Sequence, residues 1–188
     1  MSHRCDNSIW SEFFSTAESP VLGPETRPGV LGRQTLNARL DSALRDASLD
    51  ETRAELLRSL ALLWHDHLDA AHTIVQRIEN EDGAFIHGIM HRREPDYWNA
   101  KYWFRNAGRH RISPALAERA ASLLAAANEP GLRDKMVPGG EWDPFAFVDA
   151  CQQAEKLAHA APVRQTLRAI QAAEFALLVD YLVSPPRS

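Results

Sequence analysis

The sequence predicts an all-α fold, a single-domain bundle of about six to eight helices. Apolar residues recur at intervals of three or four along most of the chain, which is the spacing of one face of an α-helix. No segment shows the sustained alternation of apolar and polar residues that is typical of a half-buried strand. Proline, glycine and helix-capping residues divide the chain into helix-sized lengths. Its 188 residues suit one domain with one core.

The first 32 residues are predicted to form an arm that packs on the body of the domain. This stretch is rich in proline and glycine and has no sustained period, apart from a short helix expected over residues 9–16. The helical domain is expected to span residues 33–184, and residues 185–188 form a polar tail.

Capping residues and the helical period predict where each helix of the domain begins and ends. Leucines that recur every four residues from Leu36 predict a helix that ends near Ser48. Ser48 or Asp50 then caps the longest helix, which is expected to continue to about residue 79. A turn is predicted at residues 80–83, and Asp96 is expected to cap the helix that begins at residue 97. The loop VPGGEW precedes Asp143, which is expected to cap the next helix. Further helices are predicted over residues 84–93, 97–106, 113–128, 144–160 and 162–183.

The composition is that of a globular domain outside the membrane. Hydrophobic residues make up 45% of the chain and charged residues 24%, and no apolar run reaches the roughly 18 to 20 residues of a membrane helix. The N-terminus has no apolar stretch typical of a secretion signal, so we expect a cytoplasmic protein with no membrane partner. Cys5 and Cys151 lie far apart, which argues against a disulfide framework or a thiolate zinc site.

Positive charge is concentrated in residues 87–111 although the net charge is -4. This segment holds six basic residues against two acidic ones, so the remainder of the chain is strongly acidic. A confined basic segment favours a small anionic ligand and disfavours nucleic acid, which needs an extended row of phosphate contacts. Arginine and lysine bind carboxylates and phosphates, and aromatic residues lie between them. The predicted ligand-binding residues are Arg92, Arg93, Lys101, Tyr102 and Arg105.

Two histidine patterns with the same spacing predict a site between two helices. A seam of polar residues runs along an otherwise apolar helix, and a second helix carries a matching set. Histidine and carboxylate side chains four residues apart can bind one ion, and this ligand type suits zinc, iron or manganese. The first set is His65, Asp69 and His72, and the second is His87, His91 and Glu94.

Three interpretations of these patterns stay open at this point. The first is a metal site, whose ligands would be His65, His72, His87, His91 and Glu94. The second is a catalytic or ligand-binding cluster without a metal, and the third is a buried polar network that only fixes the packing of the helices. His67 points away from the seam and is interpreted as a core histidine.

Three stretches, LLWHDHLDAAHTIVQ, HGIMHRREPDYWNAKYWFRNAGRH and EWDPFAFVDACQQA, resemble a family of uncharacterised bacterial and fungal proteins. The shared blocks are HGI(M/L)HRRE, NAKYWF and a WDPF segment followed by FVD, and the resemblance covers roughly residues 60–182. It implies no activity, because the family has no established one.

The expected function is an enzyme, with or without a metal, that acts on a small anionic metabolite. The anion would be held by Arg92, Arg93 and Lys101. The alternative is a non-catalytic module that binds a ligand or another protein and keeps the same polar residues as a buried network. The predicted catalytic residues are His65, Asp69, His72, His87 and His91, with the imidazoles as ligands or general acid/base groups and Asp69 as an orienting or coordinating carboxylate.

Overall fold

The computed structural model describes residues 7–47 and 49–184, and all regular structure within them is helical. The all-α class is therefore confirmed. The described residues form ten α-helices, more than the six to eight expected. The proposed cap at Ser48, the thiol of Cys5 and the tail at residues 185–188 lie outside them. The helices are α1 (Asn7–Ser11), α2 (Arg33–Asp46), α3 (Glu51–Trp64), α4 (Leu68–Val75), α5 (Glu81–Arg93), α6 (Tyr97–Ala107), α7 (Ser113–Ala126), α8 (Pro130–Met136), α9 (Pro144–Ala154) and α10 (Pro162–Val183), with short 3-10 helices at Glu12–Phe14 and Pro138–Gly140.

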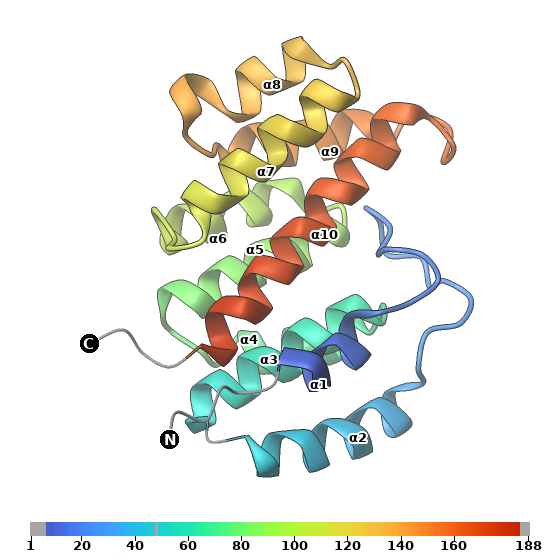
Figure 1. Ribbon diagram of the computed structural model, residues 1–188, viewed down its shortest axis with the longest axis vertical. Helices are drawn as coiled ribbons and strands as arrows, with labels where there is room; N and C mark the ends of the chain where they lie inside the picture. Colours follow the sequence, from blue (N-terminus) through green and yellow to red (C-terminus); the bar gives the residue numbers. More distant parts are fainter. Residues whose placement is uncertain (1–6, 48, 185–188) are drawn as a thin grey trace.

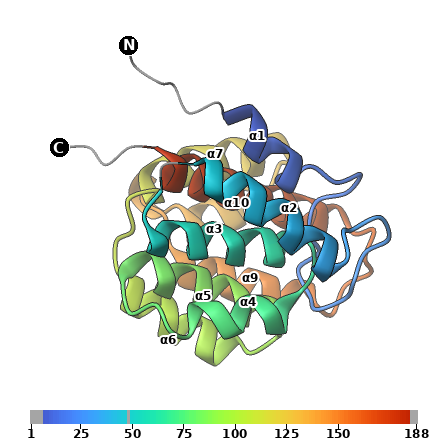
Figure 2. The ribbon, with the colours of Figure 1, turned by 90° about the horizontal axis from the view of Figure 1, so that it is seen from below.

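Helix α5 lies in the middle of the bundle (Figures 1 and 2). The long α10 crosses the molecule on one side of α5, and α6 packs along α5 on the other side. Helices α7, α8 and α9 gather at one end, and α2, α3 and α4 at the other. Among the described helices, none is long and apolar enough to cross a membrane.

Four of the described helices, α3, α5, α6 and α9, begin after a residue whose side chain caps the first turn. Asp96 and Asp143 accept hydrogen bonds from backbone N–H groups of the first turns of α6 and α9, as the sequence predicts. Asn80 does the same for Gly83 N at 2.7 Å, so α5 begins at Glu81, where a turn was expected. Two further expectations were wrong: α8 forms although no helix was predicted there, and α9 ends at Ala154, not near residue 160.

The predicted long helix over residues 50–79 is broken into α3 and α4. Asp66 adopts a left-handed conformation with φ +64. The N–H of His67 donates to Leu62 O at 2.9 Å and the N–H of Asp66 donates to Leu63 O at 3.1 Å, the pair of bonds that closes a helix when the residue after its cap is left-handed. Glycine normally occupies that position, which is why the sequence did not reveal the break.

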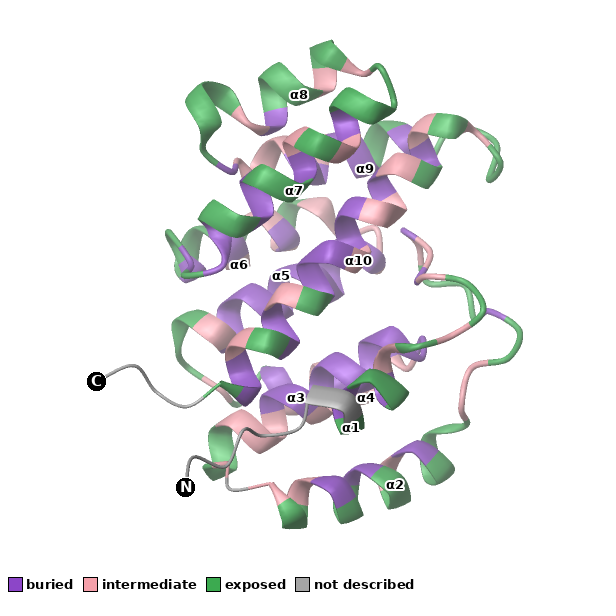
Figure 3. Ribbon diagram, viewed as in Figure 1, coloured by how far each residue is buried: buried purple, intermediate pink, exposed green. Residues whose placement is uncertain are grey.

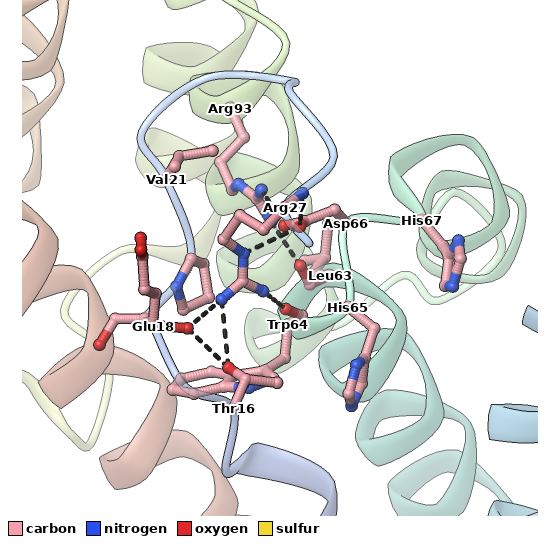
Figure 4. A network of polar contacts seen from close by, with 12 residues as sticks. Thr16, Glu18, Val21, Arg27, Leu63, Trp64, His65, Asp66, His67 and Arg93 are labelled. Atoms are coloured by element: carbon pink, nitrogen blue, oxygen red, sulfur yellow. Dashed lines mark hydrogen bonds and ion pairs between the residues drawn. The ribbon is translucent and has the colours of Figure 1, made fainter. Parts of the chain in front are cut away.

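The carboxylate of Asp66 is held by two arginines from distant segments (Figure 4). Arg27 Nε donates to Oδ2 at 2.8 Å, its backbone N–H donates to the same oxygen at 2.9 Å, and Arg93 donates to Oδ1 at 2.7 Å. All three side chains are buried. Burial alone would raise the pKa of Asp66, but the hydrogen bonds from Arg27 and the charge of Arg93 outweigh it and lower this pKa. These contacts join residues 15–32 and α5 to the junction between α3 and α4.

Helix α5 is buried along nearly its whole length (Figure 3). Arg92 forms a buried ion pair with Glu174 of α10 at 2.5 Å, so Arg92 and Arg93 tie α5 to two different parts of the molecule. A Cβ atom at Gly88 would come within 3.0 Å of the ring of Phe104, so this glycine lets α6 lie close to α5.

Replacing Asp66 by Asn is expected to lower the free energy of unfolding by about 3 to 5 kcal/mol, because two buried guanidinium groups lose their counter-charge. The matched control is Glu141→Gln, since the Glu141–Arg109 pair is exposed; this change should cost no more than about 1 kcal/mol. Urea denaturation at neutral pH measures both. Asp66→Gly would relieve the left-handed backbone but remove the carboxylate, so a Gly variant as stable as the wild type would contradict the stabilising role of the ion pairs.

Candidate functional site

Three histidines from two helices meet beside α5. His72 comes from α4, and His87 and His91 lie one turn apart on α5. One nitrogen from each ring can be chosen so that the three atoms lie within 4.8 Å of one another. His87 and His91 are buried and His72 is half-buried. We call these residues the histidine cluster.

The local sequence explains why α4 presents His72 to α5. Leu68, Ala71 and Val75 recur at helical spacing and are buried, so that face of α4 packs into the molecule. His72 follows Ala71 and lies at the edge of this face, with its ring centroid 4.9 Å from that of His87 and 5.2 Å from that of His91.

Two rings stack on the imidazole of His87. Trp103 of α6 stacks on it with ring centroids 3.9 Å apart and an interplanar angle of 18°, and His91 stacks with centroids 4.8 Å apart. The close approach of α6 to α5 at Gly88 allows this stacking. The orientation of His87 is therefore fixed by ring packing.

Neither nitrogen of His87 has a hydrogen-bond partner among the described residues, and Nδ1 of His91 has none either. Burial, together with the nearby His91 and His72, lowers the pKa of His87 to about 3, and burial also lowers the pKa of His91. Both rings are consequently neutral at pH 7. Neutral imidazole with a free nitrogen lone pair is the form that binds a metal ion.

His65 does not belong to this cluster, because the break between α3 and α4 separates it from His72. Its Nδ1 accepts from Leu31 N at 3.1 Å and its Nε2 lies 3.1 Å from Phe13 O. His110 is similar, with Nε2 2.8 Å from Asp82 and Nδ1 accepting from Ile112 N at 3.3 Å. His67 is half-buried rather than in the core, with Nε2 2.8 Å from Leu31 O. Among the described residues, the buried imidazoles outside the cluster, those of His65 and His110, thus use both nitrogens.

Carboxylates border the cluster on one side. Glu94 and Asp96 approach Nδ1 of His91 to 3.5 and 3.8 Å, which is close enough for electrostatic attraction, although neither forms a hydrogen bond with it. Burial raises the pKa of Glu94; His72 opposes this effect, and the charges of Asp69 and Asp96 add to it. Asp69 is exposed on α4.

A polar pocket of about 430 Å³ adjoins the cluster through Glu94. Its lining includes the carboxylates of Asp66, Asp69 and Glu94, together with Thr26 and Arg33. A small molecule in this pocket would therefore contact the carboxylate that borders His91.

The predicted ligand-binding residues do not come together around the histidines. Arg92 and Arg93 have no exposed side-chain surface and are both used in ion pairs inside the protein, a placement that does not suit the uptake of an anion from solvent. Lys101 pairs with Asp149 at 2.5 Å. Tyr102 is exposed and stacks with Trp98, and Arg105 lies over the ring of Phe145.

Some residues of the site had a signal in the sequence and others had none. Trp103 and Asp96 are close to the histidines in the sequence, but no pattern there assigns either of them to the histidine site. Asp96 is indeed the cap of α6 and still lies near His91. Arg33 reaches the pocket only through the packing of α2, so no local pattern could have indicated it.

Replacing His87 by Phe is expected to stabilise the protein in the presence of a chelator by about 1 kcal/mol or more, because Phe keeps the stacking on Trp103 and removes two unpartnered nitrogens.

The unfolded chain protonates His87 near pH 6.5, whereas the folded chain does so only near pH 3. The unfolded state therefore binds more protons between these values, and stability is lost as the pH falls. The slope of unfolding free energy against pH should be flatter in His87→Phe and unchanged in a His159→Gln control; equal slopes in all three proteins would be the contrary result.

Comparison of the chain with models of protein families, with curated proteins and with solved structures gave no match.

Proposed function

We propose that this protein is a metal-dependent enzyme whose ion is bound by His72, His87 and His91. The observation that carries the proposal is the state of the imidazole nitrogens. A buried polar atom without a partner costs about 1 to 3 kcal/mol, and the other buried histidines avoid this cost by bonding at both nitrogens. His87 bonds at neither and His91 leaves Nδ1 unused, while both point into a group of three rings. An ion would bind one nitrogen from each of the three rings, and so give a partner to one of the two unpartnered nitrogens of His87.

Zinc is the ion that this ligand set suits best, with iron and manganese as the other choices. Zinc with three histidine ligands keeps a fourth position open, and there it can activate water or polarise a substrate oxygen. Ligand nitrogens around tetrahedral zinc are about 3.4 Å apart. The three chosen nitrogens lie within 4.8 Å of one another, so they would move closer together on binding.

Glu94 is the residue we assign to proton transfer. Its carboxylate borders both His91 and the polar pocket, so it can reach a molecule in either place. Its raised pKa brings it closer to neutral pH, where an acid or base is most effective. Asp96 accepts hydrogen bonds from Asn99 and stays beside His91 as a fixed negative charge.

The substrate in this proposal is a small molecule with an anionic group. Arg33 lines the pocket and makes no ion pair with the described residues, so its guanidinium is free to receive that group. This role replaces the one that the sequence suggested for Arg92 and Arg93. Cleavage of a bond by water is the chemistry that a three-histidine ion with an adjacent carboxylate serves most directly.

The metal content of untagged protein tests the first step. Protein made in metal-replete medium and dialysed without chelator should hold about one equivalent of zinc, iron or manganese per chain. His72→Ala and His87→Phe should each lose it, and His159→Gln should retain it. No bound metal, or the same content in all four proteins, would contradict the proposal.

Substitution with cobalt tests whether the ion is catalytic or only structural. Azide should change the visible bands of the cobalt protein, because an open coordination position can accept it. Glu94→Gln should retain cobalt and respond in the same way. If azide changes the bands of Glu94→Gln but not those of the wild type, Glu94 is a fourth ligand and the ion is structural.

A further inference from the structure

A second pocket, of about 380 Å³, includes Phe85 of α5 in its lining and shares no lining residue with the polar pocket. Phe85 and Phe104, both nearly fully buried, form part of its wall. Trp142 and Phe145 form another part, where the chain enters α9. Four aromatic rings thus surround a space of the size that small-molecule ligands occupy.

Two hydrogen-bond donors among the lining residues have no protein acceptor among the described residues. Arg105 is exposed, lies 5.7 Å over the ring of Phe145 and has no carboxylate partner among the described residues. In contrast, the nearby Arg109 already pairs with Glu141 at 2.8 Å. Trp142 is only 8% exposed, and its buried indole N–H has no acceptor among the described residues. Buried tryptophan N–H groups usually find a partner.

We propose that this pocket binds a small aromatic carboxylate. The aromatic ring of the ligand packs among the four aromatic side chains, in the offset or edge-on contacts that such rings prefer. Its carboxylate accepts hydrogen bonds from the guanidinium of Arg105 and from the indole N–H of Trp142. This occupant satisfies both unused donors and fills the apolar space at once.

Other ligand classes satisfy only part of the pocket. A phosphate or another hydrated anion would pair with Arg105 but would lose its water against aromatic walls. A neutral aromatic molecule would fill the space but would leave the guanidinium without a counter-charge. An acidic group attached to one or two rings matches both features.

Calorimetric titration with phenylacetate and indole-3-acetate, each compared with its neutral amide, tests this proposal. At least one acid should bind the wild type. Its amide should bind with an affinity lower by about tenfold or more, because the charge-assisted hydrogen bond is lost. Arg105→Gln should lower the affinity for the acid by about tenfold or more and leave the affinity for the amide unchanged. Arg39→Gln, an exposed arginine on α2, is the matched control and should bind like the wild type.

The indole N–H resonance of Trp142 locates the ligand. It is assigned by its absence in Trp142→Phe, and it should move when the acid is added to the wild type. The titration is repeated with His87→Phe in the presence of a chelator, where binding should persist, so failure of the metal proposal does not affect this result. Absence of binding by both acids, equal binding of acid and amide, or binding that survives Arg105→Gln unchanged would each overturn the proposal.

Discussion

Two buried guanidinium groups converge on the carboxylate of Asp66, at a point where the backbone has left the helical conformation. A left-handed non-glycine residue costs about 1 to 2 kcal/mol, and the ion pairs hold it in place. Because α3 stops here, α4 can turn and lie against α5. In an unbroken helix His65 and His72 would share one face. The histidine cluster therefore depends on a contact that none of its members makes.

Buried charge fixes the orientation of α5 in the bundle. Arg92 and Arg93 leave α5 toward Glu174 of α10 and toward Asp66, so α5 is fixed in rotation as well as in position. Replacing such pairs by apolar residues is often neutral for stability, but leaving one partner alone is costly. A rotation of α5 would break both pairs. The same constraint holds His87 and His91 toward α4, and their burial keeps them neutral.

Local signals predicted the all-α class and several helix starts. The caps at Asp96 and Asp143 and the prolines of α7, α9 and α10 marked helix starts correctly, because each acts within one turn. His87 and His91 belong together because they share a helix. The place of His65 could not be predicted, since it follows from Asp66 taking a conformation that Arg27 and Arg93 stabilise from 39 and 27 residues away. The burial of Arg92 and Arg93 could not be predicted from the sequence for the same reason, because their ion-pair partners lie far away along the chain.

The segment before α2 has no helix between residues 15 and 32, yet it supplies partners that the domain cannot replace. Arg27 holds Asp66, Phe13 and Leu31 satisfy both nitrogens of His65, and Gln171 of α10 donates to Pro20 O at 3.2 Å. A fragment that began at Arg33 would leave these groups buried and unpaired or open to water. Although the composition changes at residue 33, the described residues before it, 7–32, supply partners to buried groups of the helices that follow, so we expect a cut at this boundary to destabilise those helices.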